Sequence, residues 1–226
     1  LSSSSAASDV YKRQVFYACV KRNLIKEIRV AQLAGYVSEN AAYHHGEASL
    51  QSTIIGMSQN YVGSNNINIL MPNGQFGTRI MGGADSASPR YIHTELNRLM
   101  DVIYPVEDMP LLDYLDDGGM LVEPKYYVPI IPMILVNGMN GIGTGFSTMI
   151  PKFNPLDVVE NIKRKLNNRP YKVIHPWYNN FKGQIMEIKE DEYISKGCYQ
   201  IIDDKTIEIT ELPIGVWTEN YKKFLD

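Results

Sequence analysis

The chain has 226 residues, of which 44% are hydrophobic and 21% are charged. This length and composition allow one large or two small cores, and they exclude a disordered polymer. The two cysteines, Cys19 and Cys198, lie far apart and outside any CxxC motif, which excludes a disulfide scaffold or a zinc module. No run approaches the roughly 20 apolar residues of a membrane span, so we predict no membrane partner.

A formal net charge of −3 argues at first sight against a nucleic-acid partner, but the charges are segregated. Residues 21–100 carry seven bases against five acids, and residues 125–185 carry eight bases against two acids. Residues 101–124 carry seven acids and no base, and residues 186–226 carry ten acids against five bases. Two basic zones therefore alternate with two acidic ones. We interpret the acidic stretch Asp101–Glu123 as a solvated connector.

The first 14 residues are set apart by their composition. Leu1–Ser8 is a Ser/Ala run without periodicity and without the apolar region of a signal peptide. Ser4–Gln14 is also what one reading frame of a transposon adapter used in sequencing libraries encodes. We therefore expect residues 1–14 to be an adapter-derived or disordered tail. If they derive from an adapter, we expect that they replace natural sequence that preceded Val15.

The elements that follow are closely spaced. Val15–Val20 is an apolar, strand-like run, and the basic patch behind it includes Lys21 and Arg22. Apolar residues at helical spacing predict one helix over residues 24–37 and, after a polar joint, a second over residues 50–61. Helix, turn and helix in this order are typical of a helix-turn-helix protein.

The middle of the chain predicts loops and a third helix. Residues 67–71 alternate as a strand does, and a Pro-Asn-Gly turn follows them. Residues 74–91 are rich in glycine and small side chains, and apolar spacing predicts a helix over residues 92–103. Two helices followed by such a region are compatible with a winged helix-turn-helix.

The last third is predicted to be α+β. A basic helix is expected over Leu156–Asn167, and strands over Gly183–Ile188, Tyr199–Ile202 and Thr206–Ile209. The glycine-rich run Gly141–Gly145 has GxGxG spacing, without the GxGxxG pattern or the Lys-Ser/Thr of nucleotide-binding loops. A tight loop that presents an apolar side chain is therefore favoured over a nucleotide site.

Two pairs of adjacent residues could carry chemistry. His44 and His45 point in different directions on any regular element, which disfavours a metal site; they are either phosphate-binding donors or ordinary surface histidines. Arg90 precedes Tyr91 in the small-residue loop. A tyrosine hydroxyl can attack a phosphodiester when cationic neighbours stabilise its charge, but the chain has 15 tyrosines, so this pair alone is weak support for a nucleophile.

Seven segments, taken together, resemble eukaryotic-type DNA topoisomerase II, a type IIA enzyme, from about Val15 to the end of the chain. They are AQLAGYVSE (31–39), AYHHGEASL (42–50), QNYVGSNN (59–66), GQFGTR (74–79), GGADSASPRYIHT (82–94), VPIIPMILVNGMNGIGTGFS (128–147) and FKG (181–183). The resemblance implies a winged-helix domain over residues 15–127 that carries the catalytic tyrosine, and the truncated start of an α+β tower domain over residues 128–226.

The resemblance also implies roles for single residues. Tyr91 matches the nucleophile that forms a 5′-phosphotyrosine link, Arg90 its phosphate-stabilising neighbour, and His45 a histidine that supports the cleavage centre. Ile142 matches the isoleucine that wedges between base pairs and bends the DNA. Binding roles alone are expected for four basic or polar residues and one less certain histidine. These are Lys21, Arg22, Gln75, Arg79 and His44.

For the whole enzyme, the resemblance implies a homodimer that passes one DNA duplex through another, in the nucleus or at a site of viral DNA replication. Mg²⁺ and ATP would be bound by domains whose motifs this sequence lacks, and the chain itself is expected to bind no metal. We therefore expect the chain alone to cleave little DNA. Two alternatives remain open: a winged-helix DNA-binding module without chemistry, and a nucleotide binder built on the glycine loop.

Overall fold

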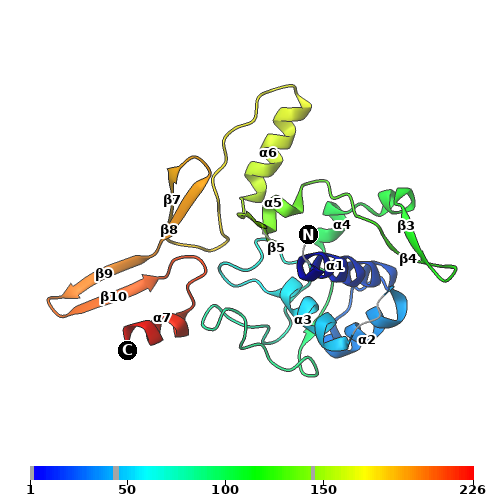
Figure 1. Cartoon of the computed structure of the whole chain (residues 1–226), viewed down its shortest axis with the longest axis horizontal. Helices are drawn as coiled ribbons and strands as arrows, with labels where there is room; N and C mark the ends of the chain where they lie inside the picture. Colours follow the sequence, from blue (N-terminus) through cyan, green and yellow to red (C-terminus); the bar gives the residue numbers. More distant parts are fainter. Residues whose placement is uncertain (1–2, 43–45, 144–145) are drawn as a thin grey trace.

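The computed structural model describes residues 3–42, 46–143 and 146–226 (Figure 1). Its helices are α1 (Ser3–Lys21), α2 (Val30–Asn40), α3 (Glu47–Ser58), α4 (Leu99–Ile103), α5 (Met133–Asn137), α6 (Pro155–Leu166) and α7 (Thr218–Leu225), with a 3-10 helix η1 at Val106–Leu111. Its strands are β1 (Ile28–Arg29), β2 (His93–Thr94), β3 (Tyr114–Asp117), β4 (Met120–Pro124), β5 (Met139–Gly143), β6 (Phe146–Ile150), β7 (Gln184–Lys189), β8 (Glu192–Lys196), β9 (Cys198–Asp203) and β10 (Thr206–Glu211).

Helices α1, α2 and α3 pack on one another and form the centre of the hydrophobic core. Helix α2 buries apolar residues at positions i, i+3, i+4 and i+7, which places them on one face. These are Val30, Leu33, Ala34 and Val37. Helix α1 adds Cys19, whose thiol is fully buried, and this burial raises its pKa to about 12. The thiol is therefore a packing group and not a nucleophile.

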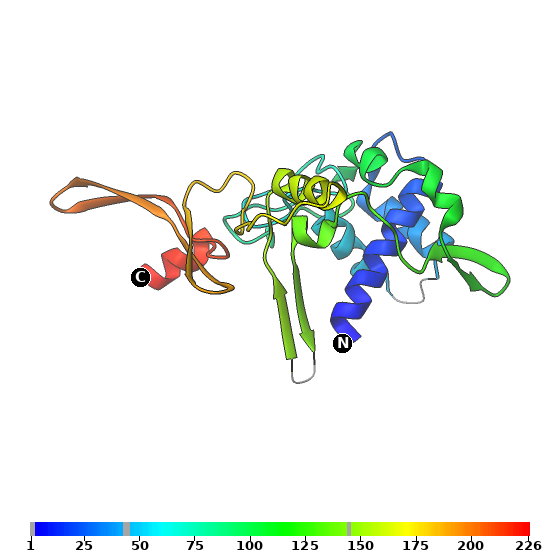
Figure 2. The same cartoon turned by 90° about the horizontal axis from the view of Figure 1, so that it is seen from above.

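The strands form two-stranded antiparallel sheets. β1 pairs with β2 across 64 residues of sequence, so that Ile28 faces Thr94 and Arg29 faces His93. The other four pairs are hairpins: β3–β4, β5–β6, β7–β8 and β9–β10. The β5–β6 hairpin projects away from the body of the molecule (Figure 2). The hairpins β7–β8 and β9–β10 lie at the end of the molecule opposite α1–α3 (Figure 1).

The predicted α+β class is confirmed, and so are most of the predicted elements. α2 and α3 are the two helices of the expected helix-turn-helix, although the first begins at residue 30 and not at residue 24, because residues 28 and 29 pair with β2 as strand β1. α6 is the expected basic helix. Helix α6 begins as its sequence dictates, since the Asn154 side chain accepts a hydrogen bond from the Leu156 amide at 2.9 Å and Pro155 occupies the first turn. Strands β7, β9 and β10 cover the three strands predicted in the last third.

Three predicted elements are wrong. Val15–Val20 is the end of helix α1 and not a strand, because a short apolar run fits a helix buried on several sides equally well. Residues 67–71 form only a single bridge between Leu70 and Leu96. Residues 92–103 are helical only over α4, because residues 93 and 94 pair with β1 instead.

The structure also differs from the expected tail and connector. Residues 3–14 are helical within α1, and the Gln14 side chain is buried. Its amide nitrogen donates hydrogen bonds to the Glu123 carboxylate and to the Ala42 carbonyl, each at 2.9 Å. Glu123 in turn accepts from the Ala42 amide at 3.1 Å and is only 1% exposed. The acidic stretch thus ends in a buried anchor that joins α1, residue 42 and β4, so it is not solvated throughout.

We expect Glu123→Ala to lower the free energy of unfolding by about 3 kcal/mol, because it leaves the Ala42 amide without an acceptor inside the protein and removes one of the two acceptors of the Gln14 side chain. Urea denaturation followed by circular dichroism measures the change. Glu107, an exposed acid of the same stretch, provides the control, since Glu107→Ala is expected to change stability by less than about 0.5 kcal/mol. Equal effects of the two substitutions would contradict the anchor.

The core runs across the expected domain boundary at residue 127. Ile131, Val136 and Val158 belong to the same cluster of buried residues as the helices α1–α3. The side chain of Asn66 reinforces this connection, because its amide nitrogen donates to the carbonyls of Val136 and Trp177 at 2.9 and 3.1 Å. Within the described ranges, no helix is both long and apolar enough to cross a membrane.

Candidate functional site

Tyr91 ends a tight turn in which its amide donates to the Ser88 carbonyl at 2.9 Å. The next residue, Ile92, is 2% exposed and fixes the turn in the core, whereas Tyr91 is 78% exposed and Arg90 is also exposed. In the described part of the chain, no side chain is hydrogen-bonded to the Tyr91 hydroxyl or the Arg90 guanidinium. The turn, fixed by the buried Ile92, therefore exposes the phenol of Tyr91 and the guanidinium of the preceding Arg90.

Backbone hydrogen bonds fasten this turn to the start of α2. The Val30 amide donates to the Ile92 carbonyl at 3.0 Å, and the Ala31 amide donates to the Pro89 carbonyl at 3.1 Å. These two amides belong to the first turn of a helix, where they lack partners within the helix itself. On the other side, His93 and Asn73 exchange two backbone hydrogen bonds of 3.0 Å. The position of Tyr91 is thus set by main-chain contacts that leave its side chain free.

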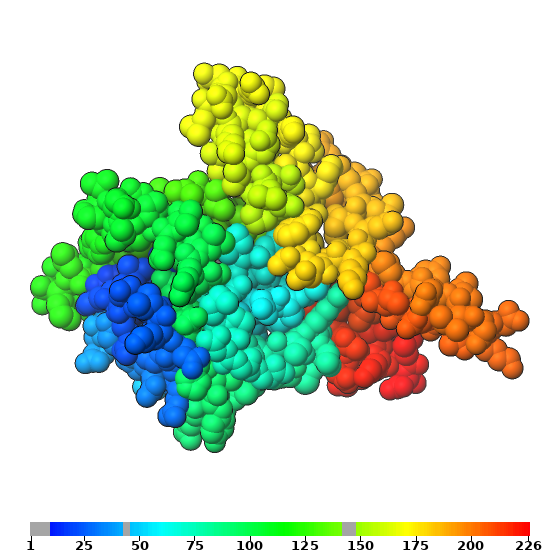
Figure 3. Space-filling model, turned by 180° about the vertical axis from the view of Figure 1, so that it is seen from behind, coloured from blue at the N-terminus to red at the C-terminus, as the bar shows by residue number. Residues whose placement is uncertain are grey.

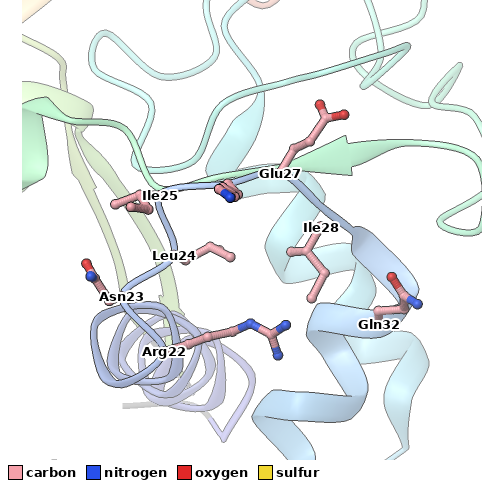
Figure 4. Close-up of a pocket in the computed structure, with 8 residues that line it drawn as sticks. Arg22, Asn23, Leu24, Ile25, Glu27, Ile28 and Gln32 are labelled. Carbon is pink, nitrogen blue, oxygen red and sulfur yellow. The ribbon is translucent and has the colours of Figure 1, made fainter.

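The basic patch at the end of α1 lies near the start of α2. The Lys21 ammonium lies 5.6 Å from the centre of the Tyr17 ring, and the Arg22 guanidinium lies 5.0 Å from that of Tyr36. Arg22 also lines a hollow of about 490 Å³ together with Gln32 and the segment 23–28 (Figure 4). Because Ile28 of this segment is the first residue of β1, which pairs with β2, the hollow and the Tyr91 turn share the same supporting strand.

The two predicted binding residues of the GQFGTR segment have different surroundings. Gln75 is exposed, and its carbonyl accepts from the Ala87 amide at 2.9 Å. The Arg79 guanidinium forms an ion pair with the Glu211 carboxylate and donates to the Leu212 carbonyl. Arg79 is thus occupied within the chain, which does not fit its expected role of binding DNA directly.

The loop between these residues is also bonded internally. The Thr78 hydroxyl and amide donate to the two carboxylate oxygens of Asp85 at 2.6 and 2.8 Å. These hydrogen bonds hold the pKa of Asp85 below its usual range. The Gln59 side chain joins the loop to the end of α3, because its amide nitrogen donates to the Phe76 carbonyl at 2.9 Å.

Ile142 lies on β5, where it pairs with Ser147 of β6, and thus near the end of the projecting hairpin (Figure 2). Gly141 and Gly143 are residues of the same strand. A strand that returns as a hairpin does not place glycine amides at a helix N-terminus, which speaks against the nucleotide binder. His44 and His45 lie outside the described residues.

The contact between the loop of residues 74–91, which leads to Tyr91, and the segment 211–219 was not predicted from the sequence. Glu211 is the last residue of β10 and lies 132 residues from Arg79, and Trp217 packs against Gly82. Nothing in the local sequence around Glu211 distinguishes it from the nine other acids of the last acidic zone. Only its position at the end of a strand, next to Leu212-Pro213, hints at a fixed environment.

The fold and site together define a protein with a helix-turn-helix core and an exposed, adjacent arginine and tyrosine, Arg90 and Tyr91. The family of the DNA gyrase/topoisomerase IV A subunit matches residues 10–226. The chain belongs to this family.

Curated relatives and a solved structure agree with the assignment. Over 95% of its length the chain is 53% identical to the probable DNA topoisomerase 2 of Dictyostelium discoideum and 52% identical to DNA topoisomerase 2 of Saccharomyces cerevisiae. A DNA topoisomerase 2 of Acanthamoeba polyphaga mimivirus is 53% identical over 95% of the chain. The crystal structure of the DNA-binding, cleavage and re-ligation domain of Plasmodium falciparum topoisomerase II superposes with a TM-score of 0.93 at 52% identity, over 96% of this chain.

The chain spans only part of these proteins. It covers 14% of the Dictyostelium relative, 15% of the yeast relative and 17% of the viral one. It covers 30% of the Plasmodium chain in the crystal structure.

Proposed function

We propose that this chain is the part of a type IIA DNA topoisomerase that breaks and rejoins DNA, with Tyr91 as the nucleophile and Arg90 as its phosphate-binding partner. The observation that carries the proposal is the exposed Tyr91 side chain on a turn fixed to α2 and β2 by main-chain hydrogen bonds. The match to a cleavage and re-ligation domain at 52% identity supports the same conclusion. An aromatic side chain that is 78% exposed on a firmly anchored turn contributes little to packing, so chemistry explains its placement better.

The proposed reaction exchanges one phosphodiester for another. The Tyr91 oxygen forms a bond to phosphorus, and the bond from phosphorus to the 3′ oxygen breaks. The proton that Tyr91 loses is balanced by the one that the leaving 3′ oxygen gains. Arg90 can hold two phosphate oxygens at once and stabilise their charge. Because the new phosphotyrosine ester keeps the energy of the old bond, the reverse reaction rejoins the strand without a further reactant.

The partner that suits this site is double-stranded DNA. The basic residues between the end of α1 and the start of α2 suit a phosphate backbone, and we propose that Lys21 and Arg22 bind it beside Tyr91. Gln75 is exposed and free to take part, and Ile142 on the projecting hairpin suits insertion between base pairs. We also propose, from the family resemblance alone, that His45 supports the cleavage centre and that His44 contributes to DNA binding.

The remaining features of the whole enzyme are proposed from the family. They are a homodimer, ATP-dependent passage of one duplex through another, and action in the nucleus or at a site of viral DNA replication. Among the described residues, no three of the types His, Cys, Asp and Glu gather as metal ligands do. From the family resemblance, Mg²⁺ and ATP are proposed to bind other parts of the full enzyme, and this chain is proposed to contribute Tyr91 and Arg90.

A covalent-adduct assay tests the proposal. The chain is mixed with the separately expressed metal-binding toprim domain of a relative, Mg²⁺ or Mn²⁺, and nicked DNA labelled at the 3′ end, so that the label stays on the strand that becomes linked to the tyrosine. We expect a protease-sensitive adduct whose attached nucleotide maps by mass spectrometry to the peptide that contains Tyr91. Salt-sensitive DNA binding without any adduct would favour the alternative of a DNA-binding module without chemistry.

A further inference from the structure

The segment 211–219, which we name the brace, lies directly against the loop that leads to Tyr91. Figure 3 shows the red end of the chain beside the teal residues of that loop. The Glu219 amide donates to the Ile80 carbonyl at 3.0 Å, which fixes the far end of the brace. The loop, residues 74–91, is thus supported from outside the helical core.

A partly buried ion pair fixes the near end of the brace. The side chains of Arg79 and Glu211 are 20% and 5% exposed. Glu211 uses one carboxylate oxygen for Arg79 and the other for the Lys182 amide at 3.0 Å, while Arg79 also donates to the Leu212 carbonyl. Because each of the two side chains has two partners, neither can rotate freely. The pair therefore fixes the orientation of the loop as well as its distance from the brace.

Trp217 fills the space between these two ends. Its indole packs so closely on Gly82 that a Cβ there would lie 2.4 Å from the indole nitrogen, and it meets the Tyr61 ring edge-on at 5.8 Å. Because Tyr61 follows α3, the tryptophan is held between the loop and the helical core. The brace therefore contacts the loop through charge, main chain and ring packing at three separate points.

The braced loop continues to Tyr91 over few residues. Its two sides are joined by the hydrogen bond from the Ala87 amide to the Gln75 carbonyl, and Ser88 then opens the turn that presents Tyr91. A shift of Arg79 is consequently transmitted to Tyr91 through a short loop with internal hydrogen bonds. Displacement of a reacting group by about 1 Å can cost about 100-fold in rate.

We propose that Arg79 and Glu211 are positioning residues for Tyr91, which hold its loop in the geometry of attack without touching DNA. This inference rests on the proposed function for its effect on chemistry, but the bracing itself can be measured separately. It assigns to Arg79 a role other than the DNA contact that its sequence suggested.

The first measurement is hydrogen exchange of this chain. In Arg79→Ala, amides of residues 76–91 are expected to exchange at least about tenfold faster than in the parent, while those of α2 and α3 keep their protection. Glu211→Gln, which keeps the shape of the side chain, is expected to give a smaller increase in the same segment. Equal acceleration in α2 would indicate general destabilisation and overturn the proposal, as would unchanged exchange in residues 76–91.

The second measurement is the rate of adduct formation in the reconstituted assay, together with DNA affinity by fluorescence anisotropy. Arg79→Ala is expected to lower the single-turnover rate by about 100-fold with DNA affinity within about twofold of the parent. The exchanged pair Arg79→Glu with Glu211→Arg is expected to recover part of the rate. Lys125→Ala, which breaks the exposed pair of Lys125 with Asp113, serves as the matched control and is expected to change neither quantity.

The outcomes separate the two proposals. If the parent forms no adduct, the proposed function fails, and the exchange experiment still decides whether Arg79 and Glu211 brace the loop. If the parent forms an adduct and Arg79→Ala forms it at the same rate, the positioning role fails alone. A loss of DNA affinity in Arg79→Ala that matches its loss of rate would identify Arg79 as a DNA contact and likewise overturn the inference.

Discussion

Replacement of Tyr91 by phenylalanine is expected to abolish the covalent adduct, with a fall of at least about 10,000-fold in its rate of formation. The phenylalanine ring keeps the size and the exposed position of the tyrosine but has no oxygen to bond to phosphorus. Since the side chain is 78% exposed and no described side chain is hydrogen-bonded to its hydroxyl, stability is expected to change by less than about 0.5 kcal/mol.

The adduct is measured on denaturing gels with end-labelled nicked DNA, and binding by anisotropy at several salt concentrations. Tyr199→Phe is the control, because Tyr199 is another tyrosine that is 69% exposed. It is expected to leave adduct and binding unchanged. A full adduct in Tyr91→Phe would show that another residue is the nucleophile.

Gly77→Ala is expected to be the most destabilising single change in the loop, with a loss of about 4 kcal/mol. Gly77 has φ +103°, which side chains rarely adopt, and an added Cβ would lie 2.6 Å from the Gly83 Cα and carbonyl oxygen. Both neighbours are main-chain atoms and cannot rotate away. The loop must therefore open, and it takes with it the contacts of the brace and the support of Tyr91.

Thermal and urea denaturation of this chain measure the loss. Gly118→Ala isolates the effect of close packing, because Gly118 also has a positive φ, +63°, but has nothing within 4 Å of an added Cβ. That control is expected to cost only about 1 kcal/mol. If both variants lose the same amount of stability, backbone conformation alone would explain the effect of Gly77→Ala, and the close approach to Gly83 would not contribute to it.

The sequence was informative wherever a signal is local. The apolar spacing over residues 24–37 predicted a helix, which the structure has as α2, and the basic stretch 156–167 predicted α6. The resemblance to topoisomerase II, carried by seven colinear segments, predicted the family that the comparisons confirm. Its assignments for Tyr91, Arg90 and Ile142 stay predictions, of which the adduct assay tests that for Tyr91.

The features that the sequence did not predict depend on partners far along the chain. Val15–Val20 is apolar all round because α1 is buried among other elements, and this pattern suits a strand as well as a helix. Glu123 looked like one acid of a solvated stretch, yet it anchors Gln14 across 109 residues. Arg79 looked like a free base beside DNA, and only the three-dimensional fold brings Glu211 to it. No local pattern records such pairings.

The separation of Arg79 and Glu211 by 132 residues has a consequence for how the site is made. Closure of so long a loop is entropically costly and comes after the local helices α2 and α3 can form. During synthesis, Tyr91 leaves the ribosome well before residue 211 exists. A growing chain therefore carries its reactive tyrosine on an unsupported loop, and the site reaches its final geometry only when the last hairpin has folded back.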